Sequence, residues 1–178
     1  MKSNFLFIGA MFLFLAFTTS SCSDDDDGGS AGNAAAGTIV AKVDGVDFQS
    51  TEMLTTGNKV TSGPADAMTL QGTDNSGKGF NFLINGYDGV GTYTFGDGNA
   101  VQVISVIGNY IEANASDPTN SQTWTAPYDN DSVRGEIQFS TDDGENVQGT
   151  FSFTCKNPND GSIKDITEGS FDINYTTF

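Results

Sequence analysis

A two-residue alternation of apolar and polar side chains dominates the last third of the chain. Every second position from 133 to 139 and from 147 to 155 is apolar or glycine, and the two runs meet at a turn, 142–145. This period gives a strand one buried face and one wet face, whereas an amphipathic helix needs a period near 3.6. A further turn, 157–161, precedes a third run, 170–175. We predict a three-stranded antiparallel meander here.

The same alternation begins near residue 38, and no segment has a helical period. The expected early turns lie at 44–45, 74–77 and 88–89, where Asp, Asn and Gly cluster. The segment 101–111 is apolar on both faces, which predicts a central or bulged strand. Many short strands joined by such turns predict a single all-β domain over residues 37–178. Its architecture is expected to be an antiparallel β-sandwich or a partly open β-barrel.

Residues 1–21 have the three parts of a secretory signal peptide. Lys2 supplies the positive charge, an apolar run from Phe5 to Phe17 follows, and small residues precede Cys22. The apolar run is shorter than the roughly 20 residues of a membrane span. A stop at one cysteine predicts cleavage before Cys22 and lipidation of its thiol, which would anchor the chain stably in a membrane. The alternative is an ordinary signal peptide with an incidental cysteine.

Cys22 is followed at once by an acidic run: Ser23, Asp24, Asp25, Asp26 and Asp27. This arrangement resembles the export signal of Bacteroidetes surface lipoproteins. The resemblance implies a lipid-anchored location in the outer membrane with the domain at the cell surface. A solvated, self-repelling linker is the alternative, since like charges in a block repel. Residues 22–36 as a whole, ending in a Gly- and Ala-rich stretch, are expected to form a flexible tether.

The domain also resembles a family of small Bacteroidetes lipoproteins of uncharacterised function. The matching stretches are 41–45 (Ala-Lys-Val-Asp-Gly), 91–95 (Gly-Thr-Tyr-Thr-Phe), 149–154 (Gly-Thr-Phe-Ser-Phe-Thr) and 168–172 (Glu-Gly-Ser-Phe-Asp). They consist of turn glycines and alternating aromatic residues. The resemblance therefore implies an all-β lipoprotein and carries over no catalytic residue.

Charge and residue content exclude several function classes. Removal of residues 1–21 takes away one charged residue, Lys2, so the formal charge falls from −16 to −17. A chain this acidic, with no cluster of Lys and Arg, does not suit nucleic acid. The chain has no histidine, which excludes imidazole-based catalysis and imidazole metal ligands. We expect no catalytic residue and no cofactor. Calcium is the one metal ion for which the sequence offers candidate ligands.

Two groups of reactive side chains have a plain structural interpretation. Cys155 shares a strand face with Phe151 and Phe153, so we expect a buried, inert thiol instead of a nucleophile. Carboxylates gather at Asp142, Asp143 and Glu145, but at the tip of an expected hairpin. A general acid needs burial to raise its pKa, and a hairpin tip offers little. We therefore expect a solvated turn there.

The loop near residue 128 contains the candidate binding residues. Trp124 and Tyr128 lie in a polar, proline-containing segment, which suggests an exposed aromatic platform for a glycan. The alternative is that Trp124, the only tryptophan, closes one end of the core. Asp129 and Asp131 could supply oxygen ligands to calcium, although the spacing does not match an EF-hand and a plain loop is the alternative.

These observations predict an outer-membrane lipoprotein whose β domain is a non-catalytic binding module. The expected ligand is a glycan or another extracellular molecule, and the expected membrane partner is lipid, through Cys22. The alternative is a structural or assembly lipoprotein that acts through a protein partner in the envelope.

Overall fold

The computed structural model describes residues 33–62, 65–96, 105–129 and 132–178. The strands within them are β1 (Thr38–Val43), β2 (Val46–Gln49), β3 (Thr55–Ser62), β4 (Ala65–Thr73), β5 (Lys78–Tyr87), β6 (Gly91–Thr94), β7 (Ser105–Glu112), β8 (Gln122–Ala126), β9 (Gly135–Asp142), β10 (Asn146–Lys156) and β11 (Ile163–Thr177). Two short 3-10 helices, η1 (Glu52–Leu54) and η2 (Pro118–Asn120), complete the described elements. None of the helices in this part of the chain is long and apolar enough to cross a membrane.

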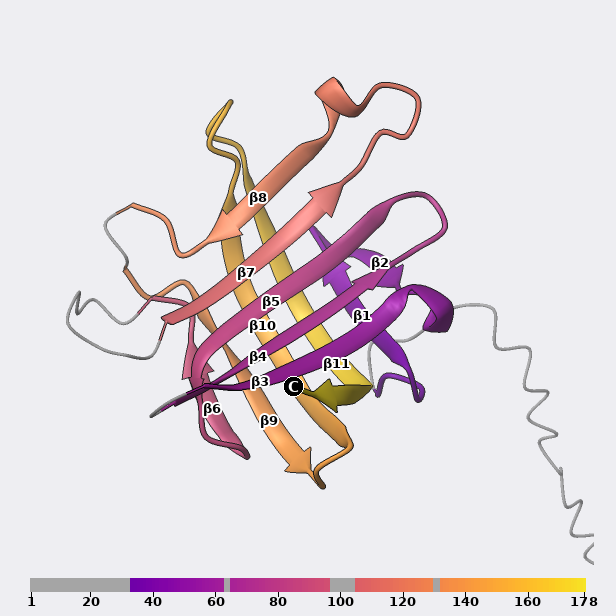
Figure 1. The fold of residues 1–178 in the computed structure, drawn as a ribbon. Coiled ribbons are helices and arrows are strands. Elements are labelled where there is room, and N and C mark those ends of the chain that lie inside the picture. The colour runs from indigo at the N-terminus through magenta and orange to yellow at the C-terminus, as the bar shows by residue number, and fades with distance from the viewer. Residues whose placement is uncertain (1–32, 63–64, 97–104, 130–131) are drawn as a thin grey trace, which may run out of the picture.

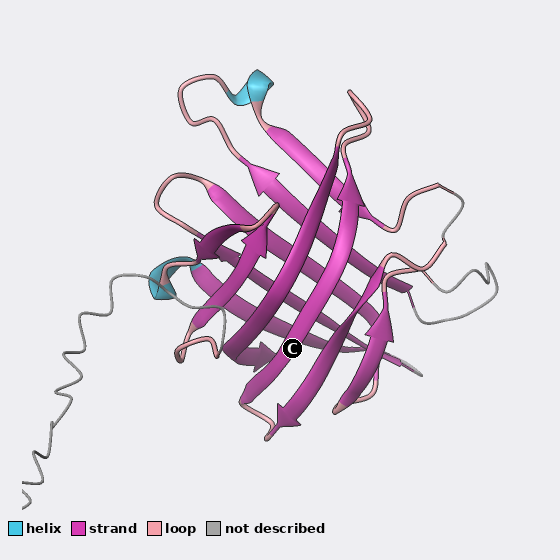
Figure 2. Ribbon diagram, turned by 180° about the vertical axis from the view of Figure 1, so that it is seen from behind, coloured by secondary structure: helices cyan, strands magenta, loops and turns pink. Residues whose placement is uncertain are grey.

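The strands form two layers that face each other (Figures 1 and 2). One layer has the order β3-β4-β5-β7-β8, and the other has the order β2-β1-β11-β10-β9-β6. The layers join on both sides: β11 pairs with β3 through three residue pairs, and β8 pairs with β10 through one. The predicted all-β fold is confirmed as a sandwich-like structure in which seven strands close a ring.

One pairing in the ring is parallel, which the sequence pattern did not indicate. β11 and β3 run in the same direction, while the six other pairs of the ring are antiparallel. A closed ring with an odd number of strands cannot alternate direction throughout, so at least one parallel pair is unavoidable. The wholly antiparallel expectation is therefore corrected at this position.

The C-terminal meander is confirmed, with one difference in β11. β9 pairs antiparallel with β10, and β10 with β11. β11 begins at Ile163, well before the predicted residue 170. A register shift occurs near Glu168, whose backbone has a positive φ of 51°. Such a bulge moves the inward face by one residue. The bulge hides the first half of the strand from a period-two pattern, because Ile166 and Phe171 are both buried although they lie five positions apart, an odd offset.

Other local expectations are also confirmed. Asp44 and Gly45 join β1 to β2 with φ values of 51° and 80°, which is the left-handed backbone that a two-residue hairpin of type I′ requires. β7 is a central strand, paired with β5 on one side and β8 on the other. The first four residues of the segment predicted for it, 101–104, lie outside the described residues.

Aromatic rings fill the space between the layers. Phe82, which has no exposed surface, has its ring centre 4.8 Å from that of Phe151, 6.0 Å from that of Phe153 and 6.1 Å from that of Phe95. Phe80 packs on the same group, with its ring centre 5.4 Å from that of Phe151. These rings come from both layers, so the core itself fastens one layer to the other.

Asp142 links the layers at the opposite end from the β10–β11 turn, and it is not the solvated residue expected at a hairpin tip. Its carboxylate accepts hydrogen bonds from the hydroxyls of Tyr175 (2.7 Å) and Tyr87 (2.9 Å) and from the backbone N–H of Gly144 (3.1 Å). Partial burial acts to raise the pKa of Asp142, but these hydrogen bonds outweigh it and hold that pKa below its ordinary value. Burial, with the Asp142 hydrogen bond, raises the pKa of Tyr175 to about 12.

We expect Asp142→Asn to lower the free energy of unfolding at neutral pH by about 1–2 kcal/mol, because the hydroxyls lose a charged acceptor. A carboxyl with a depressed folded pKa stabilises the fold above its unfolded pKa of about 3.9, and that stabilisation is lost as the pH falls through the lower folded value. The difference between wild type and variant should therefore shrink below about pH 4. Urea titrations at several pH values measure this, with the exposed Glu145→Gln as control. A difference that stays constant with pH would contradict the assignment.

The thiol of Cys155 is buried, as predicted from its strand face. The side chain is 0% exposed, and Sγ lies 3.8 Å from the carbonyl oxygen of Lys164. Burial, with a smaller contribution from the nearby Asp44, raises the pKa of Cys155 to about 12. At neutral pH the group is therefore a thiol without nucleophilic character.

We expect Cys155 to resist thiol reagents while the chain is folded. In a chain produced without its first 22 residues it is the only cysteine. Ellman's reagent should then release almost no colour in native buffer and one equivalent in concentrated guanidinium chloride. Rapid release in native buffer would mean that the strand opens easily and would contradict the burial.

Candidate binding site

A pocket of about 460 Å³ lies where β8 and β10 end, beside the turn into β11. Its volume falls within the range of small-molecule sites. The residues that carry the argument are Pro127, Tyr128, Asp129, Lys156, Asn157 and Pro158. We call this the Tyr128 pocket.

The local sequence explains why a hollow forms at this position. Thr125 pairs with Lys156 in the single ladder contact between β8 and β10. Pro127 follows two residues later, and proline cannot donate a ladder hydrogen bond. The two strands therefore part directly after their contact. On the other side, Asn157 starts a tight turn in which its own Oδ1 accepts from the N–H of Asn159 (2.8 Å).

Tyr128 lies in the pocket wall, half-buried. Its hydroxyl shares a hydrogen bond of 3.0 Å with Oγ1 of Thr154. The guanidinium of Arg134 lies 3.8 Å from the ring centre, and Nζ of Lys156 lies 5.8 Å from it. Both distances suit cation–π attraction. The Tyr128 ring is therefore fixed in position, and the guanidinium of Arg134 already covers one of its faces.

Arg134 is held by backbone groups as well as by the Tyr128 ring. Its backbone N–H donates to the carbonyl of Phe95, and its carbonyl accepts from the N–H of Thr154, both at 2.8 Å. Nε and one terminal nitrogen of the guanidinium donate to the carbonyl oxygen of Tyr128 at 3.3 and 3.2 Å. The cation thus has partners in addition to any carboxylate.

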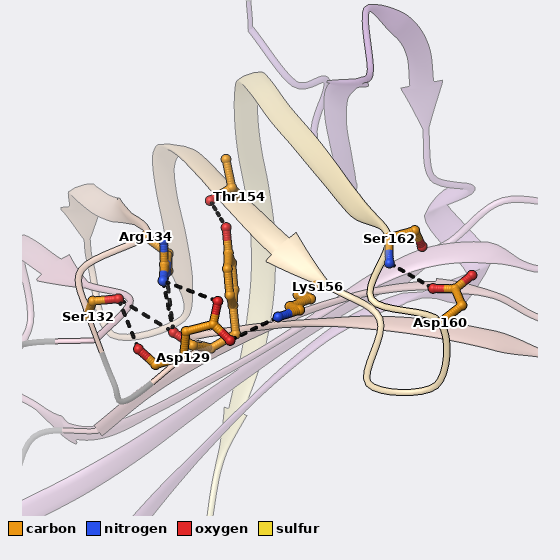
Figure 3. A network of polar contacts seen from close by, with 8 residues as sticks. Asp129, Ser132, Arg134, Thr154, Lys156, Asp160 and Ser162 are labelled. Atoms are coloured by element: carbon orange, nitrogen blue, oxygen red, sulfur yellow. Dashed lines mark hydrogen bonds and ion pairs between the residues drawn. The ribbon is translucent and has the colours of Figure 1, made fainter.

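One carboxylate, that of Asp129, lies between two cations (Figure 3). Its Oδ1 accepts from Nζ of Lys156 at 2.9 Å, and its Oδ2 lies 3.8 Å from the guanidinium of Arg134. The Asp129 side chain is 55% exposed and that of Lys156 is 32% exposed. The backbone of Asp129 has a positive φ of 55°, which aspartate tolerates better than most residues.

Of the two interpretations of Trp124, the exposed platform is wrong, and a position in the core is confirmed. Trp124 is only 6% exposed, and its Nε1 donates to Oγ of Ser162 at 2.9 Å. Its ring centre lies 5.8 Å from that of Tyr110, and Nζ of Lys164 lies 4.8 Å from it. The segment taken for a loop is strand β8, and the polar residues on either side of Trp124 form the outer face of that strand. Only Tyr128, of the two platform residues, lines the pocket.

The structure gives Asp129 no set of further carboxylate ligands for calcium among the residues it describes. The carboxylate of Asp129 is engaged by two cations, and Asp131 lies outside the described residues. Within residues 33–62, 65–96, 105–129 and 132–178, no group of three or more metal-ligating His, Cys, Asp or Glu side chains comes together. Cys22 and the acidic run from Ser23 to Asp27 also lie outside the described part.

The sequence pattern did not single out Arg134 and Lys156 as binding residues. Both occupy outward-facing positions of an alternating pattern, which look like ordinary solvated charges. They converge on Asp129 only because the β9–β10 hairpin and the end of β8 meet. The one sequence signal that pointed to them was the scarcity of basic residues, since the whole chain has only seven.

A family model for a domain of unknown function, DUF6252, matches residues 35–173, which is most of the chain. The chain belongs to the DUF6252 family. The match covers β1 to β10 and most of β11, so the two-layered β structure and the Tyr128 pocket are both within the DUF6252 domain. No curated protein and no solved structure matched the chain.

Proposed function

We propose that this protein is a surface-exposed outer-membrane lipoprotein whose DUF6252 domain is a non-catalytic binding module for a glycan or another extracellular ligand. The Tyr128 pocket is the observation that carries the proposal. It combines the apolar faces of Pro127, Tyr128 and Pro158 with a few polar groups at defined positions. Mostly apolar walls with few, well-placed polar groups are typical of small-molecule sites.

A binding role accounts for this pocket better than catalysis does. Acid–base chemistry needs a side chain tuned toward the working pH and free to exchange a proton. The carboxylate of the pocket, Asp129, is instead paired with Lys156 and Arg134. The hydroxyl of Tyr128 is likewise engaged by Thr154.

The location in this proposal rests on the N-terminal residues. The signal-like segment 1–21, Cys22 and the acidic run after it support lipid anchoring and export to the outer leaflet. Protease treatment of intact cells tests it with three chains: wild type, a chain with Asp24–Asp27 replaced by alanine, and Cys22→Ala. Digestion of wild type with protection of the Asp24–Asp27 variant is expected. Protection of wild type would contradict surface exposure.

The binding role is tested with the chain produced without its first 22 residues. A panel of neutral and acidic oligosaccharides is screened by ligand-observed NMR. Hits are titrated against wild type and Tyr128→Ala, and we expect the variant to lose binding. Lys42→Gln serves as control because Lys42 pairs with Glu168, outside the pocket. Failure of every glycan, together with crosslinking of the native chain to one envelope protein, would overturn the proposal in favour of an assembly role.

A further inference from the structure

Resting on the proposed function, we propose that the ligand of the Tyr128 pocket is an acidic sugar whose carboxylate replaces that of Asp129 beside Lys156 and Arg134. The Asp129 side chain thus occupies an anion site built by the protein in its unliganded state. The sugar ring lies against the apolar faces of Pro127 and Pro158.

The balance of charge at this position favours an anion. Among the residues that the structure describes, Arg134 and Lys156 share one carboxylate, that of Asp129, so these three side chains together carry one net positive charge. At the other ion pairs formed by the described residues, each cation faces at least one carboxylate of its own, and Lys164 faces two, Asp44 and Glu112. A local excess of positive charge in a chain with a formal charge of −16 marks the pocket for an anionic group.

The carboxylate of Asp129 can leave at little cost. It is 55% exposed, and ion pairs at exposed positions stabilise a protein by only about 0–1 kcal/mol. When it leaves, the guanidinium stays in place, because the carbonyl of Tyr128 and the backbone contacts of Arg134 still hold it. The binding groups are therefore positioned before the ligand arrives, which reduces the entropic cost of binding.

The shape of the site favours a sugar over an acidic peptide. An extended peptide binds most readily by adding to a free strand edge. At this pocket the end of β8 is already paired with Lys156 through Thr125, and Pro127 offers no N–H. A compact hollow with proline and tyrosine faces suits a single rigid ring that carries its charge on one side.

The test uses the chain without its first 22 residues and two probes that differ only at their carboxyl groups: trigalacturonate, which is charged, and its methyl ester, which is neutral. Fluorescence of Trp124 reports binding, with calorimetry as a second measurement. Trp124 is the only tryptophan, and its ring N–H donates a hydrogen bond to Ser162, the residue after Gly161 of the pocket wall. We expect trigalacturonate to bind about tenfold more tightly than the ester, since hydrogen bonds between charged groups are the stronger ones. Affinity should also fall as salt is added.

Two variants are expected to change affinity in opposite directions. Lys156→Gln should weaken trigalacturonate binding about tenfold, because it removes a charged donor. Asp129→Asn should strengthen it several-fold, because it removes the competing carboxylate. The matched controls are Lys42→Gln and Glu168→Gln, which should leave affinity unchanged. The side chains of Lys42 and Lys156 are both 32% exposed, and the backbone of Glu168, like that of Asp129, has a positive φ.

The outcomes separate this inference from the proposed function. Equal binding of acid and ester, or weaker binding by Asp129→Asn, would overturn the acidic-sugar inference and leave a glycan-binding pocket. Binding of a glutamate-rich peptide as tight as that of trigalacturonate would also overturn it. Failure of both probes and of the neutral panel, together with crosslinking of the native chain to one envelope protein, would overturn the proposed function as well.

Discussion

Replacement of Phe82 by alanine is expected to lower the free energy of unfolding by about 3–5 kcal/mol, the usual cost of a large cavity at a buried aromatic position. Phe82 is fully buried, and its ring touches partners on β10 and in the segment after β6. The loss therefore weakens contacts between the two layers. Domains of this size have a total stability of only about 5–15 kcal/mol, so much of the fold's margin would disappear.

Guanidinium denaturation followed by far-UV circular dichroism measures the effect. Phe82→Leu should lose much less, because leucine refills most of the volume. Phe178→Ala is the exposed control, since the Phe178 side chain is 72% exposed. A loss below about 1 kcal/mol for Phe82→Ala would show that the core is looser than the ring contacts indicate.

Gly149→Ala is expected to cost about 3 kcal/mol or more for the opposite reason, which is overpacking. A Cβ at this position would lie 1.9 Å from the carbonyl oxygen of Gln138 and 2.5 Å from the ring of Phe171. The first contact is with backbone on β9, so relief requires separation of two hydrogen-bonded strands. The second requires the Phe171 ring, which is buried, to shift.

Gly91→Ala is the matched control for this substitution. Gly91 also lies in a strand, β6, but the nearest atom to its added Cβ would be 3.9 Å away, on the ring of Tyr93. We expect a change near zero for Gly91→Ala in the same denaturation experiment. If Gly149→Ala were equally neutral, the close approach of β9 and β10 at Gly149 would be disproved.

Those features of the fold that depend on neighbouring residues were predictable from sequence. The period-two pattern and the Asp-Gly turns gave the meander and the first hairpin because each hairpin is encoded within a few residues of chain. Closure of the ring was not predictable, because it depends on β11 meeting β3 and on β8 meeting β10, which are pairs of segments far apart in sequence. The bulge at Glu168 defeated the pattern because one inserted residue reverses the inward face.

The sequence predicted where the candidate site lies in the chain, but not which residues form it. Tyr128 and Asp129 were identified because an aromatic residue beside a proline and several polar residues stands out in a chain of short strands. Trp124 was misplaced because the outer face of a strand and a polar loop have the same composition. Lys156 and Arg134 could not be identified, since their relation to Asp129 exists only in three dimensions.

The position of β11 in the ring also sets the order in which the protein can fold. On one side, β1 and β3 each pair with the same segment, β11 (Ile163–Thr177), at the far end of the chain. In a chain emerging from the ribosome, β1 can already pair with β2 and β3 with β4, but the other side of β1 and of β3 stays unpaired until the last residues arrive. Pairings this distant in sequence slow folding. If the chain is secreted as proposed above, late closure has an advantage, because the ring stays open until the whole chain has crossed the membrane.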